Sequence, residues 1–276
     1  MNSYRTENYI KDKVIIVTGA SSGFGKFTAM KAAELGGKVV LAARRDYLLK
    51  EICDGIRAKG GEASYIKTDL RDQRQVQEMA QFAIDTYGAI DVLVNDAGTM
   101  PLAYLSEHEI AMQAWEECID TSIKGTLYAT AAVHDQMIKQ GHSHVINVSS
   151  ILGNYGVSGC GVYNISKASV RILADSMRVE NSGKIKFSVI KPTSVAETGL
   201  VATEVDYNAG LSGIYGKIID AFTGLGTPGR DDRESIHCFD FGPEVLADNI
   251  IYVMNQPWGV NISEISVRAS GEAMFV

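Results

Sequence analysis

Short runs of Val, Ile and Leu alternate with amphipathic helical segments along most of this chain, and this alternation is its most constraining feature. Buried parallel strands typically read as continuous apolar runs, because both faces of such a strand are covered. The pattern predicts strands at 14–17, 38–43, 63–67, 90–94, 145–148, 186–190 and 262–267, and helices at 24–35, 47–58, 76–87, 111–139, 162–179 and 243–254. Right-handed crossovers between such strands give an α/β fold with a doubly wound parallel sheet, the Rossmann fold.

The length of 276 residues suits one large domain, so we expect residues 1–276 to form a single Rossmann unit. Residues 1–10 are expected to be an N-terminal extension. The stretch from about 195 to 242 breaks the alternation and is rich in Gly, Tyr and Phe. Long insertions of this kind are usually functional, so we interpret it as a lid over the substrate. The alternative is an ordinary surface loop.

The composition argues against several classes of protein. The net charge of -7 argues against nucleic acid as a partner, because nucleic-acid-binding domains usually carry a basic face. We expect no membrane span, because no apolar run reaches about 18 residues, and the polar N-terminus lacks the core of a signal peptide. The cysteines form no CxxC pair, which predicts free thiols in the cytoplasm, and the histidines lack metal-site spacing.

A glycine-rich turn, TGASSGFG at Thr18–Gly25, follows the first expected strand and opens the first expected helix. Glycine lets the backbone approach a pyrophosphate closely, and the helix N-terminus adds free N–H groups and a partial positive charge. The turn is therefore predicted to bind a dinucleotide, and the alternative is an ordinary strand–helix turn. The predicted contact residues are Gly19, Ser21, Ser22, Gly23, Phe24 and Gly25.

The end of the second expected strand indicates which dinucleotide binds. NAD-binding proteins usually place Asp or Glu there for the ribose hydroxyls, whereas NADP-binding proteins use Arg for the 2′-phosphate. Here Ala43 is followed by Arg44 and Arg45, and arginine pairs strongly with phosphate. This pattern favours NADP(H). The alternative is a solvated arginine pair, and the neighbouring Asp46 weakens the positive field.

Tyr163 and Lys167 are four residues apart on an expected helix, which places both on one face. An ammonium group near a phenol lowers the phenol pKa toward neutral pH, where general acid–base catalysis is efficient. Ser150 comes just after the fifth expected strand, and its hydroxyl can hold a substrate oxygen against the tyrosine. The three residues together predict a proton-transfer site.

At this point the chain resembles the short-chain dehydrogenase/reductase family, and specifically its NADP-preferring members. The resemblance covers about residues 11–195 and rests on four motifs in order. They are TGASSGFG at Thr18–Gly25, NDAG at Asn95–Gly98, Ser150 in NVSSILG, and YNISK at Tyr163–Lys167.

The resemblance implies a role for each matching residue. Ser150 would orient the carbonyl, Tyr163 would transfer the proton, and Lys167 would lower the Tyr pKa and bind the nicotinamide ribose. Asp69 would contact the adenine. Further cofactor contacts would come from Leu70, Asn95, Ala97, Gly98, Pro192, Thr193 and Val195.

Three positions depart from the family pattern. Asp96 stands where a second Asn is usual, and we expect this to affect sheet stability more than chemistry. Ser122 replaces the Asn that holds a water linking Lys to solvent, and its hydroxyl is expected to hold that water in a working, slower relay. Thr193 replaces the usual Gly beside the nicotinamide, where its bulk is expected to narrow or reorient the pocket.

These features predict an NADP(H)-dependent carbonyl reductase or alcohol dehydrogenase acting on a ketone or secondary alcohol. An apolar substrate is expected, steroid-like, cyclic or polyketide-like, from the lid candidates Tyr155, Val157, Tyr207, Leu211, Ile214, Tyr215, Ile218 and Phe222. Two alternatives remain open: an NADP(H)-binding regulatory protein without turnover, and an epimerase or dehydratase on the same scaffold. The resemblance also implies a homodimer or homotetramer.

Overall fold

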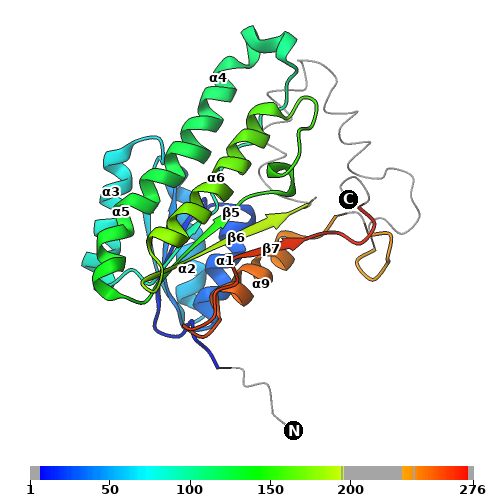
Figure 1. Ribbon diagram of the computed structural model, residues 1–276. Coiled ribbons are helices and arrows are strands. Elements are labelled where there is room, and N and C mark those ends of the chain that lie inside the picture. Colours follow the sequence, from blue (N-terminus) through cyan, green and yellow to red (C-terminus); the bar gives the residue numbers. More distant parts are fainter. Residues whose placement is uncertain (1–6, 194, 196–231, 239, 273–276) are drawn as a thin grey trace.

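A computed structural model describes residues 7–193, 195, 232–238 and 240–272. Seven parallel strands form one sheet in the order β3-β2-β1-β4-β5-β6-β7, and helices cover both of its faces (Figure 1). The strands are β1 Val14–Thr18, β2 Lys38–Ala43, β3 Glu62–Lys67, β4 Val92–Asn95, β5 Ser143–Val148, β6 Ile185–Pro192 and β7 Glu264–Val267. This arrangement confirms the predicted doubly wound sheet.

The helices follow the predicted alternation with the strands. They are α1 Gly23–Glu34, α2 Asp46–Ala58, α3 Gln73–Tyr87, α4 His108–Cys118, α5 Gly125–Gln140, α6 Gly161–Glu180 and α9 Pro243–Met254. The single helix predicted over 111–139 is divided by a π-helical segment, η2 Ile119–Lys124. Two short 3-10 turns, η1 Leu105–Glu107 and η3 Ile151–Gly153, lie after β4 and β5.

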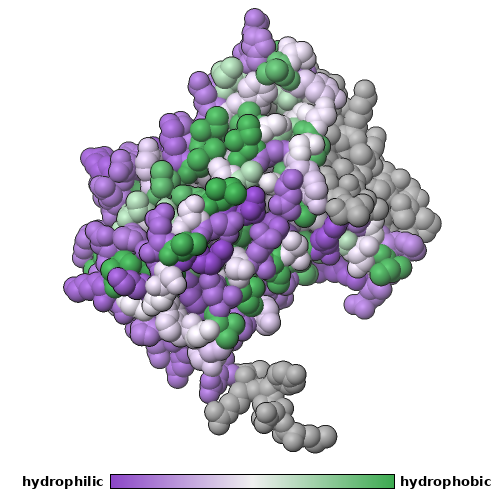
Figure 2. All heavy atoms as spheres, viewed as in Figure 1, coloured by the Kyte–Doolittle hydropathy of each residue, from purple (hydrophilic) through white to green (hydrophobic). Residues whose placement is uncertain are grey.

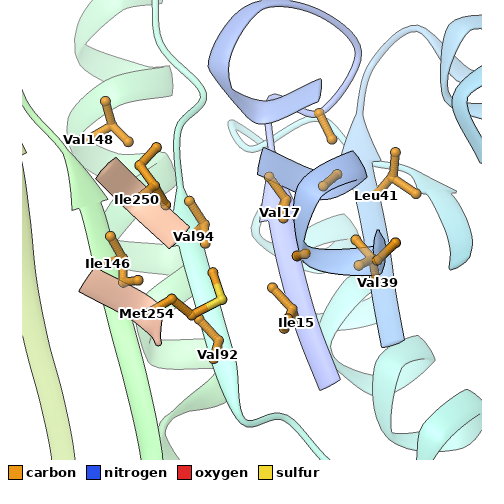
Figure 3. Packing of buried hydrophobic residues seen from close by; sticks show 14 of the residues in the cluster. Ile15, Val17, Val39, Leu41, Val92, Val94, Ile146, Val148, Ile250 and Met254 are labelled. Atoms are coloured by element: carbon orange, nitrogen blue, oxygen red, sulfur yellow. The ribbon is translucent and has the colours of Figure 1, made fainter. Parts of the chain in front are cut away.

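Alternate residues of each strand face opposite layers of helices, because successive side chains point to opposite faces of a sheet. Ile15 and Val17 of β1 belong to the core with α1, α2 and α9. Figure 3 shows this core between the sheet and α9. Val14 and Ile16 belong to the other core, with α3, α5 and α6. Strands buried on both faces explain why the sequence showed continuous apolar runs.

The fourth strand begins later than the sequence suggested. The apolar run 90–94 predicted Ile90 as its first residue, whereas the strand begins at Val92. The Ile90 N–H donates to the Gln140 side-chain oxygen, and the Ile90 carbonyl accepts from the Gln140 amide and the Ser143 hydroxyl. Ile90 is therefore fully buried but pairs with the end of α5 in place of a strand.

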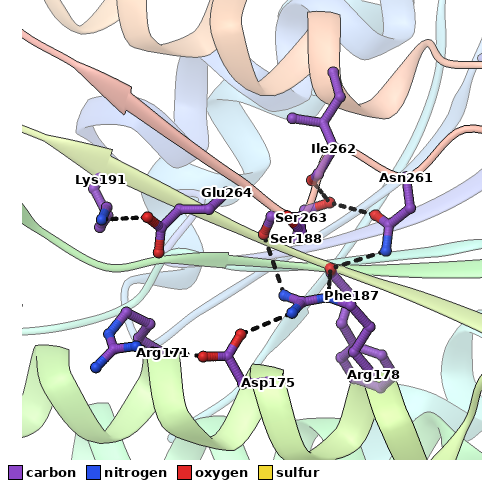
Figure 4. Close-up of polar contacts among 10 residues, drawn as sticks. All are labelled: Arg171, Asp175, Arg178, Phe187, Ser188, Lys191, Asn261, Ile262, Ser263 and Glu264. Atoms are coloured by element: carbon purple, nitrogen blue, oxygen red, sulfur yellow. Dashed lines mark hydrogen bonds and ion pairs between the residues drawn. The ribbon is translucent and has the colours of Figure 1, made fainter.

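Arg178 of α6 joins the C-terminal part of the chain to the sheet (Figure 4). Its guanidinium donates to the carbonyl oxygens of Phe187 at 3.0 Å and Ser263 at 3.2 Å, and pairs with Asp175 at 2.7 Å. Lys191 of β6 forms an ion pair with Glu264 of β7. These contacts fix the last strand, and with it the position of α6.

The predicted lid lies largely outside the described residues. Within the described part, Val195 forms a parallel bridge with Phe241, so the two ends of this insertion are adjacent. None of the described helices is both long and apolar enough to cross a membrane. All four cysteines, Cys53, Cys118, Cys160 and Cys238, are buried free thiols, as the sequence predicted.

Candidate active site

The predicted site residues gather at the C-terminal edge of the sheet. Gly19, Arg44 and Asp69 follow β1, β2 and β3, while Asn95 and Pro192 end β4 and β6. The strand order reverses between the neighbouring strands β1 and β4. Ligands of doubly wound sheets bind in the crevice at such a switch point, so the fold places these residues where a ligand is expected.

The glycine-rich turn fits a pyrophosphate group. Gly19 has a positive φ of 69°, and a Cβ there would lie 2.9 Å from the Ala97 backbone N. A Cβ on Gly25 would lie 2.8 Å from the Gly19 carbonyl oxygen. The N-cap residue of α1, Ser22, makes no side-chain capping bond, and the first turn holds no acidic residue. The first N–H groups of α1 are therefore suited to receive an anion.

The two predicted 2′-phosphate ligands have different surroundings. Arg45 donates to the hydroxyls of Ser21 at 2.8 Å and Ser22 at 2.9 Å, which joins the end of β2 to the glycine-rich turn. Arg44 lies close enough to Asp69 to affect its charge. Arg71, which donates to both Asp69 oxygens, lowers the pKa of that carboxyl most, and Arg44 lowers it further. Arg44 and Arg45 therefore place positive charge at the end of β2, whereas the charge of Arg71 is paired with Asp69.

Some of the predicted cofactor contacts have side chains that serve packing or pairing. Leu70 belongs to one hydrophobic core, and Phe24 packs against the other. The Asn95 amide donates to the Asn147 side-chain oxygen at 2.9 Å and the Thr130 hydroxyl at 3.3 Å. These side chains therefore take part in packing and in pairing between neighbouring elements, and their contact with a cofactor stays a prediction.

Ser150, Tyr163 and Lys167 are brought together as predicted. Ser150 lies two residues after β5, where its hydroxyl accepts from the Leu152 N–H at 3.2 Å. Tyr163 and Lys167 lie one turn apart on α6, and the Lys167 Nζ is 5.7 Å from the centre of the Tyr163 ring. All three side chains are buried. The Ser150 hydroxyl interacts with the Tyr163 side chain and favours its ionised form.

The expectation of a lowered Tyr163 pKa was wrong for the structure as it stands. Burial raises the pKa of the phenol well above its usual value, and the Ser150 contact offsets only part of this rise. The nearby Asp96 carboxyl raises it further. The sequence could place an ammonium near the phenol, but it could not show how deeply the phenol is buried.

Lys167 is fixed at both its side chain and its backbone. Its ammonium donates to the Val148 carbonyl oxygen at 3.0 Å, and its own carbonyl accepts from the Ser149 hydroxyl at 2.7 Å. Burial lowers the pKa of this lysine, whereas the Asp96 carboxyl raises it. The ammonium is thus held in a fixed position with an acidic neighbour.

Ser122 lies in the π-helical segment, close to Lys167. A Cβ on Gly98 would lie 3.2 Å from the Ser122 hydroxyl and 3.4 Å from the Lys167 Nζ, so both groups border this glycine. The Ser122 carbonyl accepts from the Thr126 hydroxyl at 2.8 Å. π-helical segments often occur at functional sites. The position is consistent with the expected relay, which stays a prediction.

Thr193 is held by the last strand. Its N–H donates to the Val267 carbonyl at 3.0 Å, and its hydroxyl accepts from the Ala269 N–H at 3.2 Å. The hydroxyl here therefore extends the pairing of β6 with β7 past the strand ends, which no sequence motif indicated. Whether its bulk narrows the pocket stays a prediction.

The expectation that Asp96 affects sheet stability more than chemistry stays a prediction, although its surroundings lie at the site. It is Asn95 that bridges β4 and β5. The Asp96 carboxyl faces the Gly25 N–H at the start of α1 and acts on the charge of Lys167. The Thr18 hydroxyl, also missed, accepts from the Asp96 N–H at 3.1 Å and positions this segment. In the described part of the chain no group of His, Cys, Asp or Glu side chains could hold a metal ion.

Comparisons with known proteins agree with this geometry. The family model for short chain dehydrogenase matches residues 13–208. An uncharacterized oxidoreductase of Listeria monocytogenes is 35% identical over 268 residues, which cover 95% of this chain and 98% of that protein. A serine dehydrogenase in complex with NADP+ has a TM-score of 0.80 at 26% identity, over 94% of this chain and 96% of the other. An alcohol dehydrogenase of Thermococcus sibiricus, complexed with 5-hydroxy-NADP, has a TM-score of 0.76 at 21% identity. The match covers 95% of this chain and 98% of the other, and it shows that the two proteins share a fold. The family match, the relative and the site together show that this chain belongs to the short-chain dehydrogenase/reductase family of oxidoreductases.

Proposed function

We propose that this protein transfers a hydride between NADP(H) and a ketone or secondary alcohol. The observation that carries the proposal is the convergence of buried Ser150, Tyr163 and Lys167 near the N-terminus of α1, where Ser22 makes no side-chain capping bond. A bound nicotinamide supplies or accepts the hydride. Ser150 holds the substrate oxygen, and the Tyr163 hydroxyl gives a proton to that oxygen in reduction and takes it back in oxidation.

NADP(H) is favoured over NAD(H) by the positive charge around the end of β2. Arg44 and Arg45 both follow that strand, where an acid for the ribose hydroxyls would otherwise be expected. Related structures contain either NADP or NAD, so the family alone does not decide between them. The arginines are the support for our choice.

An apolar substrate is favoured by the residues around the phenol. Ile151, Leu152 and Tyr163 form a small hydrophobic cluster with Met100 and Val157. The other lid candidates, Tyr207 to Phe222, lie outside the described residues. Serine is a second candidate substrate, because two serine dehydrogenase structures are similar to this chain over 94% of its length.

The proposal is tested by following NADPH absorbance with a panel of cyclic and steroid-like ketones, and NADP+ reduction with secondary alcohols and serine. We expect turnover with an apolar member, and Tyr163→Phe should lower kcat by about 100-fold to 10,000-fold while NADPH still binds. Binding of NADPH without oxidation of any substrate would favour a regulatory protein. Product formation without a stoichiometric change in NADPH would favour an epimerase or dehydratase.

We also propose that the chain forms a homodimer or homotetramer in the cytoplasm. Apolar side chains are exposed on α5 and α6, including Leu127, Ile172 and Val179, and Figure 2 shows hydrophobic residues on this face. Burial of such a patch in an interface is favourable. Sedimentation of the wild type and of Ile172→Glu tests this, with dissociation expected in the variant.

The proposed location in the cytoplasm is supported by the four free cysteines, which are typical of a reducing compartment.

A further inference from the structure

The Asp96 side chain lies between the two functional parts of the site. It follows β4, and one of its oxygens, Oδ2, would be 2.8 Å from a Cβ on Gly25 at the start of α1. The Gly25 N–H favours the ionised carboxyl. The other oxygen, Oδ1, is buried and has no hydrogen-bond partner among the described residues. A buried carboxylate oxygen without a donor is costly, so the protonated form is favoured at this position.

The charged and titratable groups that act on Asp96 come from α6. Lys167 attracts the carboxylate, and Tyr163 is affected by its charge. The first turn of α1 contributes its N–H groups and no acid. Burial outweighs these attractions and raises the pKa of Asp96 to about 7. The carboxyl therefore changes its charge near neutral pH.

We propose that Asp96 couples cofactor binding to proton uptake, because the nicotinamide dinucleotide binds more tightly when this carboxyl is protonated than when it is ionised. The inference rests on the proposed function, which takes the N-terminus of α1 as the pyrophosphate site. Asp96 faces that same N-terminus. An ionised carboxyl there repels the pyrophosphate and competes for the positive end of the helix, whereas a protonated one does neither.

Linkage gives the size and sign of the effect. Binding of an anion near Asp96 raises the pKa of the carboxyl further, so the complex holds a proton that the free protein has lost. Between the pKa of the free protein and that of the complex, the dissociation constant rises by up to about tenfold per pH unit. Below that window the carboxyl is protonated in both states, so its titration no longer changes the dissociation constant with pH.

The test is to measure dissociation constants for NADH and NADPH by fluorescence titration from about pH 6 to about pH 9, across the neutral range. Asp96→Asn keeps the shape of the side chain and removes its titration. Asp135→Asn is the matched control, since it makes the same charge change on the fully exposed side chain of Asp135. NADH lacks the 2′-phosphate, so its affinity does not report the titration of that group.

We expect the wild type and Asp135→Asn to lose affinity for NADH as the pH rises above neutral, and Asp96→Asn to lose much less. At a pH between the Asp96 pKa of the free protein and that of the complex, proton uptake on adding NADH to weakly buffered wild-type protein should approach one proton per chain. This second measurement needs no variant. Equal pH slopes in wild type and Asp96→Asn, or binding without proton uptake, would overturn this inference alone. Absence of binding to either cofactor at every pH would overturn the proposed function and this inference with it.

Discussion

The Lys167 ammonium donates a 3.0 Å hydrogen bond to the carbonyl oxygen of Val148, which joins α6 to the last residue of β5. A lysine is rarely buried unless its charge is paired or hydrogen-bonded. Here the bond satisfies the carbonyl of the last strand residue and keeps the ammonium beside Tyr163. One contact thus links the packing of a helix on the sheet to the position of the proposed proton-transfer group.

Lys167→Met should remove the charge while keeping most of the side-chain volume. We expect kcat to fall by about 100-fold or more, because the phenol loses its nearby ammonium group. Steady-state kinetics on the best substrate measure this. Lys184→Met, at an exposed position beyond α6, is the control and should retain wild-type turnover. Full activity in Lys167→Met would contradict the assigned role.

Arg44→Ala and Arg45→Ala should each weaken NADPH binding by about 10-fold to 100-fold and leave NADH binding little changed. Charge-assisted bonds to phosphate are stronger than neutral ones, and only NADPH carries the 2′-phosphate. Fluorescence titration with both cofactors measures the ratio. Arg74→Ala, on the exposed side of α3, should change neither affinity. If both cofactors lose affinity equally in the Arg44 and Arg45 variants, these residues do not select NADP(H).

Asn147→Ala should destabilise the sheet by about 1–3 kcal/mol, because the buried Asn95 amide loses its acceptor at 2.9 Å. Chemical denaturation gives the free energy of unfolding. Asn154→Ala at an exposed position is the control and should change it by less than about 0.5 kcal/mol. A loss no larger than that of the control would show that the paired amides do not support the strand ends.

Because of the buried His144, the free energy of unfolding should decrease as the pH falls below neutral. This histidine is buried in β5 with its Nε2 2.7 Å from the Ser188 hydroxyl, and burial lowers its pKa to about 3. The unfolded chain takes up a proton near pH 6.5, while the folded chain does so only near the lowered value. The stabilising effect of the neutral form is therefore complete above the unfolded pKa. It is lost as the pH falls from there toward about 3.

Within that pH window, His144 lowers the free energy of unfolding by up to about 1.4 kcal/mol for each pH unit of acidification. The free energy of unfolding, measured between neutral pH and about pH 4.5, should fall more steeply in wild type than in His144→Gln. His108, exposed at the start of α4, offers the control His108→Gln, which should follow the wild type. Equal slopes in wild type and His144→Gln would sink the prediction.

The order and identity of the elements could be predicted because each buried strand carries its own signal. Val14–Val17 is apolar at every position since β1 is covered on both faces, and α9 was predicted with the bounds observed. Boundaries were less certain where a tertiary partner decides them. Ile90 is as apolar as a strand residue, but its backbone pairs with the Gln140 side chain.

The active site, like the fold, has features that the sequence predicts and features that depend on tertiary contacts. By itself the sequence determined which groups meet: the glycine-rich turn, the arginines after β2, and Ser150, Tyr163 and Lys167, because spacing on a helix and position at a strand end fix where they lie. Only the tertiary structure decided how deeply these groups are buried and what surrounds Asp96. Those depend on burial and on distances between segments far apart in the chain, and a carboxyl that looked like a minor change beside Asn95 proved to face both α1 and Lys167.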